Sequence, residues 1–334
     1  MGEKVNVGLI GYGYWGRIYH RAISEINGVT VKFICDANSV IRDQLQKGIM
    51  FFDDPHKAID EGGADAIFVI TPAETHKDII MHALKYGVDT FVEKPALLSS
   101  SDLDQVLNSR PSGTIFFPGH IYAYNDKVKA LIDSVERADN EIISVFSSRK
   151  AFGPIRRDVG CIWDLFPHDL TVFDMLEMGD PVSISCKGLF PLGTANEDIA
   201  HCDIVYSKGA TSSSDLNWIY PYKVREVSVL SSRAIHVFNE MDSIAPIRYL
   251  ECPKGVGLCA NEVAYKRMGV DQYTTKINVQ ISEPLKNMII SFINAVSGCS
   301  NHAFEAEVSR AKNIIPVIEA GIKSMKKDGA RVNL

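Results

Sequence analysis

The sequence has little that would cross-link the chain or hold a structural metal. Its seven cysteines are an odd number, are scattered, and include no CxxC pair, so neither a disulfide framework nor a zinc site is predicted. They are Cys35, Cys161, Cys186, Cys202, Cys252, Cys259 and Cys299. No histidine or further cysteine flanks Cys252 and Cys259 at ligand spacing. We expect reduced thiols and no bound metal.

Long apolar runs and an excess of positive charge are also missing. No apolar stretch is long enough to span a bilayer, and the charged start of the chain does not resemble a secretory signal. With 35 Lys and Arg against 41 Asp and Glu, the net charge of −6 offers no basic field to a polyanion. We therefore expect a cytoplasmic protein that binds neither nucleic acid nor a membrane.

What is present is ample apolar material for two domains. The chain has 334 residues, of which 46% are hydrophobic. In its first third, continuously apolar runs such as 5–10 and 66–70 alternate with stretches of helical period such as 76–86. Continuously apolar strands are typical of a parallel sheet covered on both faces. We predict an α/β domain over residues 1–121, with a doubly wound parallel sheet of the Rossmann type.

After residue 122 the pattern changes to short strands joined by turn residues. Strands are expected at 142–152, 182–189, 199–206, 210–218, 225–230 and 234–238. Helices are expected at 125–135, 163–178, 283–296 and 305–326. We predict an α+β domain over residues 122–334 with a mostly antiparallel, open-faced sheet, whose last helix can pack back on the first domain. The open face needs a cover, which predicts a homodimer or homotetramer.

A glycine motif follows the first expected strand and opens a helix. Gly11 would allow a tight turn, Gly13 a close approach of the backbone to a pyrophosphate, and Gly16 close packing of helix on sheet. The helix N-terminus then offers N–H groups to the phosphates. The expected cofactor-binding residues here are Gly11, Tyr12, Gly13, Tyr14, Trp15 and Gly16.

Asp36 ends the second expected strand, 20 residues past Gly16. A carboxylate there accepts hydrogen bonds from both hydroxyls of the adenosine ribose and repels a 2′-phosphate, which favours NAD over NADP. Two alternatives stay open: Asp36 is only a turn or cap residue, or the nearby Arg42 reaches a phosphate and admits NADP.

Three further segments resemble the Gfo/Idh/MocA family of sugar and cyclitol dehydrogenases. Glu93-Lys94-Pro95 is similar to the family's EKP motif, and Asp164 to His168 is similar to its DxxxH segment. Thr71-Pro72-Ala-Glu-Thr-His76 resembles the loop that touches the nicotinamide end of the cofactor. The resemblance implies that Lys94 and His168 face the reacting carbon and that Asp164 assists. It adds to the cofactor-binding residues Thr71, Pro72, His76, Glu93 and Lys94.

The chemistry of an alcohol dehydrogenase agrees with these roles. The hydroxyl proton must leave as hydride departs, and histidine is the side chain best matched to that task near neutral pH. Lys94 can donate a hydrogen bond to the developing alkoxide. If Asp164 is the N-cap of its helix, Pro167 falls at the third helical position, where a proline is tolerated. The alternatives are that Asp164 is only a cap and that His168 is only a satisfied buried histidine.

The substrate is indicated by a segment that resembles the domain junction of the family, Gly119 to Asp126. Its pair Tyr124-Asn125, and Phe166-Pro167 in the catalytic segment, look closer to the members that act on nucleotide sugars. The resemblance implies a UDP-linked N-acetylhexosamine oxidised at C3. Alternatively, Tyr122 and Tyr124 simply pack along a strand.

A basic cluster, Arg149, Lys150, Arg156 and Arg157, precedes the catalytic segment and suits a diphosphate, although a solvated loop is the plainer interpretation. The expected substrate-binding residues are Lys94, Tyr124, Asn125, Arg149, Arg156, Arg157, Asp164 and His168. Three competing functions stay open: a free sugar or inositol dehydrogenase, a ketosugar reductase, and an NAD-binding regulator without catalysis. The presence of both Lys94 and His168 argues against the regulator.

Overall fold

The computed structural model describes residues 4–138, 140–252, 255–257, 260, 274–299 and 302–334, so Cys259 lies outside the described residues. The chain divides into two compact units, residues 1–121 with 283–315 and residues 122–282 with 316–334. The division differs from the expected domains in one respect, because residues 283–315 group with the first unit. None of the described helices is long and apolar enough to cross a membrane.

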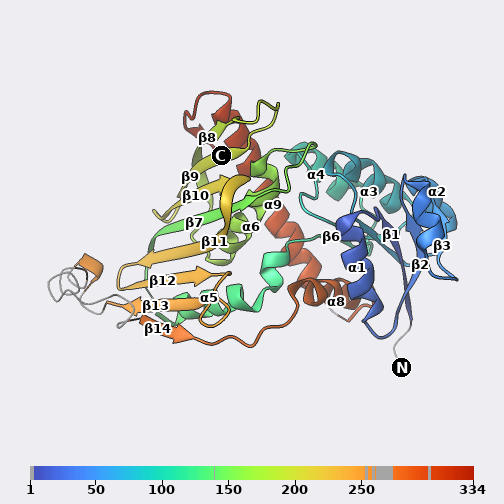
Figure 1. Ribbon diagram of the computed structural model, residues 1–334, viewed down its shortest axis with the longest axis horizontal. Helices are drawn as coiled ribbons and strands as arrows, with labels where there is room; N and C mark the ends of the chain where they lie inside the picture. Colours follow the sequence, from blue (N-terminus) through green and yellow to red (C-terminus); the bar gives the residue numbers. More distant parts are fainter. Residues whose placement is uncertain (1–3, 139, 253–254, 258–259, 261–273, 300–301) are drawn as a thin grey trace. The chain divides into compact units, whose positions relative to one another are not determined.

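The first unit contains a parallel sheet of six strands in the order β3-β2-β1-β4-β5-β6 (Figure 1). The strands are β1 (Val5–Ile10), β2 (Val29–Cys35), β3 (Met50–Phe52), β4 (Ala66–Val69), β5 (Asp89–Val92) and β6 (Phe116–Pro118). Its helical segments are α1 (Tyr14–Ser24), α2 (Pro55–Glu61), α3 (His76–Lys85), α4 (Ser100–Ser109), α8 (Pro284–Val296) and α9 (His302–Met325), which continues into the second unit, with η1 (Ser39–Gln44) and η2 (Ala73–Thr75). Strands are added on one side of β1 up to β3 and on the other side from β4 onward. The strand order therefore switches between β1 and β4, which is where Rossmann folds bind dinucleotides.

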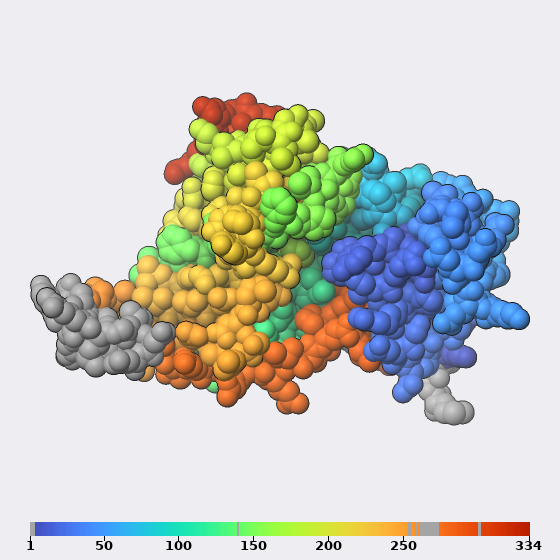
Figure 2. Space-filling model, viewed as in Figure 1, coloured from blue at the N-terminus to red at the C-terminus, as the bar shows by residue number. Residues whose placement is uncertain are grey.

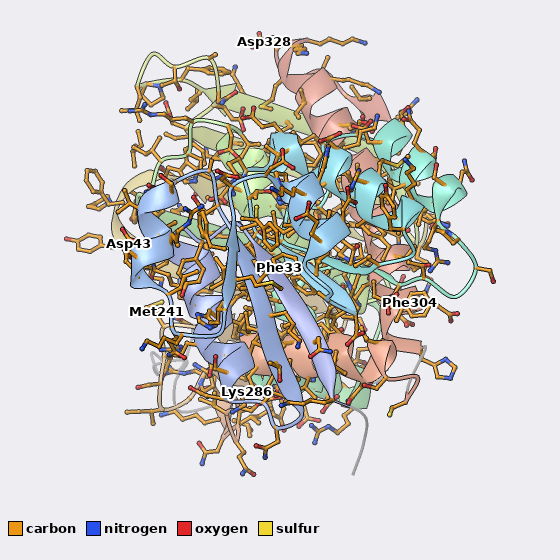
Figure 3. The ribbon with its side chains drawn as sticks, turned by 90° about the vertical axis from the view of Figure 1, so that its right-hand side faces the viewer. Phe33, Asp43, Met241, Lys286, Phe304 and Asp328 are labelled. Atoms are coloured by element: carbon orange, nitrogen blue, oxygen red, sulfur yellow. The ribbon has the colours of Figure 1, made fainter. Side chains whose placement is uncertain are left out.

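Glycines on the sheet make room for one large side chain. A Cβ atom at Gly8 would lie 2.1 Å from the ring of Phe33, and one at Gly62 would lie 2.2 Å from it. Phe33 projects from β2 in Figure 3 and is 1% exposed. The connection after β2 forms the 3₁₀ segment η1, in which Val40 donates its N–H to the Asn38 side chain.

Aromatic packing explains why α8 belongs to the first unit. Phe292 of α8 lies with its ring centroid 5.1 Å from Phe68 of β4, 5.7 Å from Phe91 of β5 and 5.5 Å from Phe117 of β6. Each such pair adds roughly 0.5–1.5 kcal/mol beyond the area it buries. In Figure 2 the atoms of α8 (orange) lie against those of α1 (dark blue), which α8 also contacts. The apolar face of α8 is thus built into this core.

The second unit contains a sheet of nine strands in the order β14-β13-β12-β11-β7-β10-β9-β8-β15. The strands are β7 (Ile142–Phe152), β8 (Pro181–Leu189), β9 (Ile199–Tyr206), β10 (Thr211–Asn217), β11 (Ile219–Ser231), β12 (Ala234–Asn239), β13 (Ile247–Glu251), β14 (Thr274–Ile277) and β15 (Val332–Asn333). All its pairings are antiparallel except that of β10 with β7. Helices α5 (Asp126–Ala138) and α6 (Cys161–Met175) pack on the sheet.

Candidate active site

The glycine motif forms the turn between β1 and α1. Gly11 has a φ of +97°, and a Cβ atom there would lie 2.6 Å from the carbonyl oxygen of Ile70. A Cβ atom at Gly16 would lie 2.1 Å from the carbonyl oxygen of Gly11. Around Gly13, by contrast, a Cβ atom would meet no described atom within 4 Å. Gly11 and Gly16 therefore serve the packing of the turn, whereas the space over Gly13 is open to a ligand.

Helix α1 starts directly after this turn and presents its N-terminus without a competing anion. Its N-cap is Gly13, which has no side chain to cap the helix, and its first turn contains no acidic residue. Tyr14, at the first position of the helix, is 78% exposed. The N–H groups of the first turn and the positive end of the helix dipole are the usual binding site for a phosphate.

Asp36 lies beside the glycine turn, immediately after β2. Its Oδ2 atom accepts a hydrogen bond of 2.7 Å from the N–H of Tyr12, and its Oδ1 atom accepts one of 2.9 Å from the N–H of Asn38. These bonds fix the half-buried carboxylate next to the turn. The guanidinium of Arg42 lies 5.1 Å from the ring centroid of Phe51.

The open space over Gly13 and the crowding at Gly16 predict opposite effects of the same substitution. Gly16→Ala is expected to lower the stability of the free protein by about 1–3 kcal/mol, because its methyl group meets backbone. Gly13→Ala is expected to leave the Tm of the free protein nearly unchanged and to weaken NAD binding by about tenfold or more, because its methyl group occupies the approach of the pyrophosphate. Thermal melts and fluorescence titration with NAD measure both effects. A Gly13→Ala protein with wild-type NAD affinity would contradict the role given to Gly13.

Glu93 connects the end of β5 to helix α1. One carboxylate oxygen accepts a short hydrogen bond from the hydroxyl of Tyr19, and the other accepts one of 2.8 Å from the N–H of Lys94. Burial raises the pKa of Tyr19 well above its usual value, and the charge of Glu93 adds to the rise, so Tyr19 remains a hydrogen-bond donor. The half-buried Lys94 thus stands on an anchored loop, and its peptide bond to Pro95 is cis.

His76 ties this loop to the loop that follows β4. Its Nδ1 atom lies 3.0 Å from the carbonyl oxygen of Pro95 and 3.2 Å from that of Ala96, and its Nε2 atom lies 2.9 Å from that of Thr71. The side chain is 1% exposed. Thr71 and His76 were predicted to belong to one loop. In the structure, His76 connects this loop to the loop that carries Lys94.

In the second unit, Asp164 and His168 lie on α6, but this helix begins earlier than predicted. Its first residue is Cys161 and its N-cap is Gly160, so Asp164 lies in the first turn and is not the N-cap. Glu197 supplies the cap from the strand-to-strand connection before β9: its Oε1 atom accepts a hydrogen bond of 2.9 Å from the N–H of Ile162. Pro167 consequently lies inside the helix rather than at its third position. The Pro167 nitrogen cannot donate to the preceding turn.

Asp164 and His168 occupy the accessible part of a helix that is otherwise mostly buried. Both are half-buried, whereas the first three residues of α6 and Asp169 are buried. A spacing of four residues places them one turn apart on the same face. The carboxylate of Asp164 lies 3.3 Å from an Nη atom of Arg156 and accepts a hydrogen bond of 3.3 Å from the Trp218 indole. This face therefore offers an oriented carboxylate and an imidazole to a ligand.

Tyr122 lies against His168 and is held by a buried polar network. The two ring centroids are 4.9 Å apart. The Tyr122 hydroxyl donates to Glu240 at 2.5 Å and accepts a hydrogen bond of 2.6 Å from Arg149. Burial raises the pKa of Tyr122 to about 12, so the hydroxyl remains protonated at neutral pH. Tyr122 belongs to a 3₁₀ segment, η3 (Ile121–Tyr124), so the alternative that Tyr122 and Tyr124 pack along a strand was wrong.

The basic residues that were expected to hold a diphosphate do not share one environment. Arg149 is 4% exposed, and its Nε and Nη2 atoms donate to Asp169 at 2.8 and 2.7 Å. Arg156 is half-buried; burial opposes its charge, but hydrogen bonds to Asp158 and the charge of Asp164 raise its pKa. Arg157 is exposed. Arg149 is thus positioned to support Tyr122, and Arg156 to pair with Asp164.

The remaining two expected substrate residues, Tyr124 and Asn125, lead into α5. Tyr124 is half-buried, and Lys129 lies over its ring at 5.9 Å from the centroid. The Asn125 side chain accepts a hydrogen bond of 2.9 Å from the N–H of Lys127 and so caps α5.

Among the described residues, no group of three or more His, Cys, Asp or Glu is placed to hold a metal ion.

Comparison with known proteins agrees with this geometry. A model of the Gfo/Idh/MocA oxidoreductase family, with its NAD-binding Rossmann fold, matches residues 5–116. This match covers about a third of the chain and includes the glycine turn and the loop that carries Lys94. The chain is 27% identical to a myo-inositol 2-dehydrogenase from Thermotoga maritima over 53% of this chain and 56% of that protein. It is 24% identical to a UDP-N-acetylglucosamine 3-dehydrogenase from Acidithiobacillus ferrooxidans over 63% of this chain and 66% of that protein.

The fold extends beyond the matched family region. The WlbA dehydrogenase from Bordetella pertussis, solved in complex with NADH and UDP-GlcNAcA, superposes with a TM-score of 0.82 at 17% identity, covering 99% of this chain and 98% of that one. At this identity the superposition shows the fold alone. Residues 5–116 are therefore similar to the NAD-binding Rossmann fold of the Gfo/Idh/MocA oxidoreductases, and both units share their fold with a solved dehydrogenase.

Proposed function

We propose that this protein is an NAD-dependent dehydrogenase that oxidises a ring hydroxyl of a sugar. The observation that carries the proposal is the pair Asp164 and His168, one turn apart on the accessible face of the largely buried α6. A buried network supports this face, and the chain also carries a complete dinucleotide turn. A structural helix needs neither the accessible imidazole nor the carboxylate beside it.

In the proposed reaction, His168 accepts the hydroxyl proton of the substrate as the carbon–hydrogen bond breaks. When bound, NAD⁺ takes up the hydride, so the substrate loses two electrons and two hydrogens and becomes a ketone. The ammonium group of Lys94 donates a hydrogen bond to the oxygen while its negative charge develops. Asp164 orients the imidazole or the substrate, and Tyr122 keeps the His168 ring in place.

We propose further that the substrate is a nucleotide sugar, and that its C3 hydroxyl is oxidised in a UDP-linked N-acetylhexosamine. Support comes from the similarity to the UDP-N-acetylglucosamine 3-dehydrogenase and from the exposed Arg157 beside the half-buried Arg156. Guanidinium groups suit the oxygens of a diphosphate. The second candidate is an inositol, because the myo-inositol 2-dehydrogenase is matched at a similar identity of 27%.

A thermal-shift screen of the NAD-loaded protein against UDP-sugars, free hexoses and inositols separates these candidates. A ligand of the native state raises its stability by RT ln(1 + [L]/Kd), which is about 2.7 kcal/mol at a hundredfold excess over Kd. Each stabilising compound is then tested as a substrate by following the absorbance of the NADH that forms. NADH formation with UDP-N-acetylglucosamine supports the proposal. NADH formation only with an inositol would show that the proposed substrate is wrong, although the protein would still be a dehydrogenase.

The position of Asp36 predicts the cofactor preference. Asp36→Ser is expected to weaken NAD binding by about tenfold or more and to leave NADP binding unchanged or improved, because the carboxylate favours the ribose hydroxyls and repels a 2′-phosphate. The measurement is the KM for each cofactor, with Asp43→Ser on the exposed side of η1 as the control. If Asp36→Ser raised the KM for NAD and for NADP equally, Asp36 would not be the residue that binds the ribose hydroxyls.

The second sheet also predicts self-association. Phe146 of β7 is 51% exposed and Val182 of β8 is 45% exposed, which leaves apolar side chains on the sheet for a partner subunit to cover. We expect a homodimer or homotetramer by light scattering. A mass of 36.9 kDa at micromolar concentration would contradict this prediction.

A further inference from the structure

A cavity in the second unit lies away from α6 and the residues of the proposed reaction. Its volume is about 340 Å³, close to the lower end of the range for small-molecule sites. The C-terminal end of α5 forms one wall, the strands β12, β13 and β14 contribute others, and Asn140 and Arg233 come from the connections before β7 and β12. Its lining residues are Ser134, Arg137, Ala138, Asn140, Arg233, Ala234, His236, Tyr249, Glu251 and Ile277.

The lining includes one buried polar side chain that lacks a partner. His236 lies on the same face of β12 as the buried Ala234 and Phe238, and α5 contacts this strand. It is 1% exposed, and neither of its ring nitrogens has a hydrogen-bond partner among the residues that the structure describes. Its neighbour in the sheet, Tyr249, stacks on it with centroids 5.6 Å apart and an interplanar angle of 22°.

A buried imidazole whose two nitrogens form no hydrogen bond with the described residues indicates that a hydrogen-bonding ligand binds beside it. Burial lowers the pKa of His236 and so favours the neutral ring; a hydrogen-bond interaction with the Ser134 backbone opposes the shift but does not have the geometry of a formed hydrogen bond. A neutral imidazole offers one donor and one acceptor. Native proteins rarely leave such atoms unsatisfied in a buried position, because the desolvation cost is not recovered. A polar molecule in the cavity would supply what His236 lacks.

The charged residues of the lining indicate which kind of molecule fits. Arg137, at the end of α5, uses its Nε atom to donate to the carbonyl oxygen of Asp133 at 3.0 Å. Within the described part of the chain, neither Arg137 nor Arg233 forms an ion pair, and Glu251 forms none either. Two guanidinium groups from different elements favour an oxyanion. One carboxylate favours hydrogen-bond donors elsewhere on the same molecule.

We propose that this cavity binds a small hydroxylated oxyanion, of the size of a sugar phosphate or a hydroxy acid. Arg137 and Arg233 bind its phosphate or carboxylate group, and a hydroxyl of the ligand meets His236. Glu251 accepts a hydrogen bond from a second hydroxyl. The inference does not depend on the proposed dehydrogenase activity, because none of these residues takes part in it.

Isothermal titration of the full chain without NAD tests the site with three probes: glucose 6-phosphate, citrate and neutral glucose. At least one of the two anions is expected to bind with a Kd below about 1 mM, while glucose does not. Arg137→Gln and Arg233→Gln are each expected to weaken that binding by about tenfold or more, because each removes a charge-assisted hydrogen bond. Binding of glucose 6-phosphate alone identifies the phosphate source, and binding of citrate alone identifies the carboxylate source.

Two control variants show whether the anion binds in this cavity or elsewhere on the protein. Arg331→Gln removes an exposed arginine outside the cavity lining and should leave the Kd unchanged. Arg157→Gln removes an exposed arginine that is proposed to hold the diphosphate of the substrate, and it should also leave the Kd unchanged if the anion binds in the cavity. The proposal is overturned if neither anion binds with a Kd below about 1 mM, or if Arg331→Gln or Arg157→Gln weakens binding as much as the two cavity variants do.

Discussion

Replacing His168 with asparagine is expected to lower kcat by a factor of about 10² or more while NAD affinity stays nearly unchanged. General acid–base catalysis contributes factors of this size, and asparagine keeps the polarity of the side chain but cannot accept the proton. His168 lies on α6 of the second unit, whereas the dinucleotide turn belongs to the first. Steady-state kinetics with the substrate found in the screen and a separate NAD titration measure the two effects.

A pH profile distinguishes a lost base from a disturbed helix. Raising the pH should partly restore turnover of the His168→Asn enzyme, because hydroxide or an ionised substrate replaces the missing base. A variant that had only lost packing would gain nothing from this change. His302→Asn, at an exposed position at the start of α9, serves as the control and should behave as the wild type at every pH. Wild-type turnover of His168→Asn would leave the histidine as a packing residue.

The sequence alone predicted the dinucleotide turn well because its physics is local. Gly11 and Gly16 are required by backbone atoms of the neighbouring strand and of the turn itself, and the order strand, turn and helix can be recognised directly in the sequence. The same holds for the parallel sheet, whose strands are short and mostly apolar. The position of Asp36 beside Tyr12 follows from the pairing of β2 with β1.

The surroundings of His168 were harder to predict because they depend on residues far apart in the chain. Helix α6 begins at Cys161 because Glu197, from a distant loop, caps it, and nothing near Asp164 in the sequence indicates that cap. Arg149 resembled a member of a basic cluster, but β7 places it inside the unit, against Asp169. The burial of Arg149 on the same side of β7 as Val145 and Ser147 is visible only in the structure.

The polar network around Tyr122 was missed for the same reason. Tyr122 meets Glu240 across 118 positions of sequence, and its contact with His168 joins a 3₁₀ segment to a helix. The residues around an aromatic side chain in the sequence do not indicate whether it packs in the core or supports a neighbouring imidazole. Only the three-dimensional contacts show that Tyr122, Arg149 and Asp169 form one buried group behind His168.

Replacing Lys94 with alanine is expected to lower kcat by a factor of about 10² or more, with a smaller effect on substrate KM. The ammonium group is proposed to contact the oxygen that becomes negative, so its loss is felt more in the transition state than in the ground state. The loop itself should keep its place, because Glu93 accepts the backbone N–H of residue 94 and His76 contacts the carbonyl oxygens that follow.

Two comparisons make the test of Lys94 specific. Lys94→Arg retains the charge and should recover part of the lost turnover, whereas Lys57→Ala, which removes an exposed lysine of α2, should change nothing. High pH should rescue Lys94→Ala less than His168→Asn, because hydroxide replaces a base but not a positive hydrogen-bond donor. If Lys94→Ala retained wild-type kcat, or raised KM alone, the ammonium group would serve binding of the substrate and not stabilisation of the alkoxide.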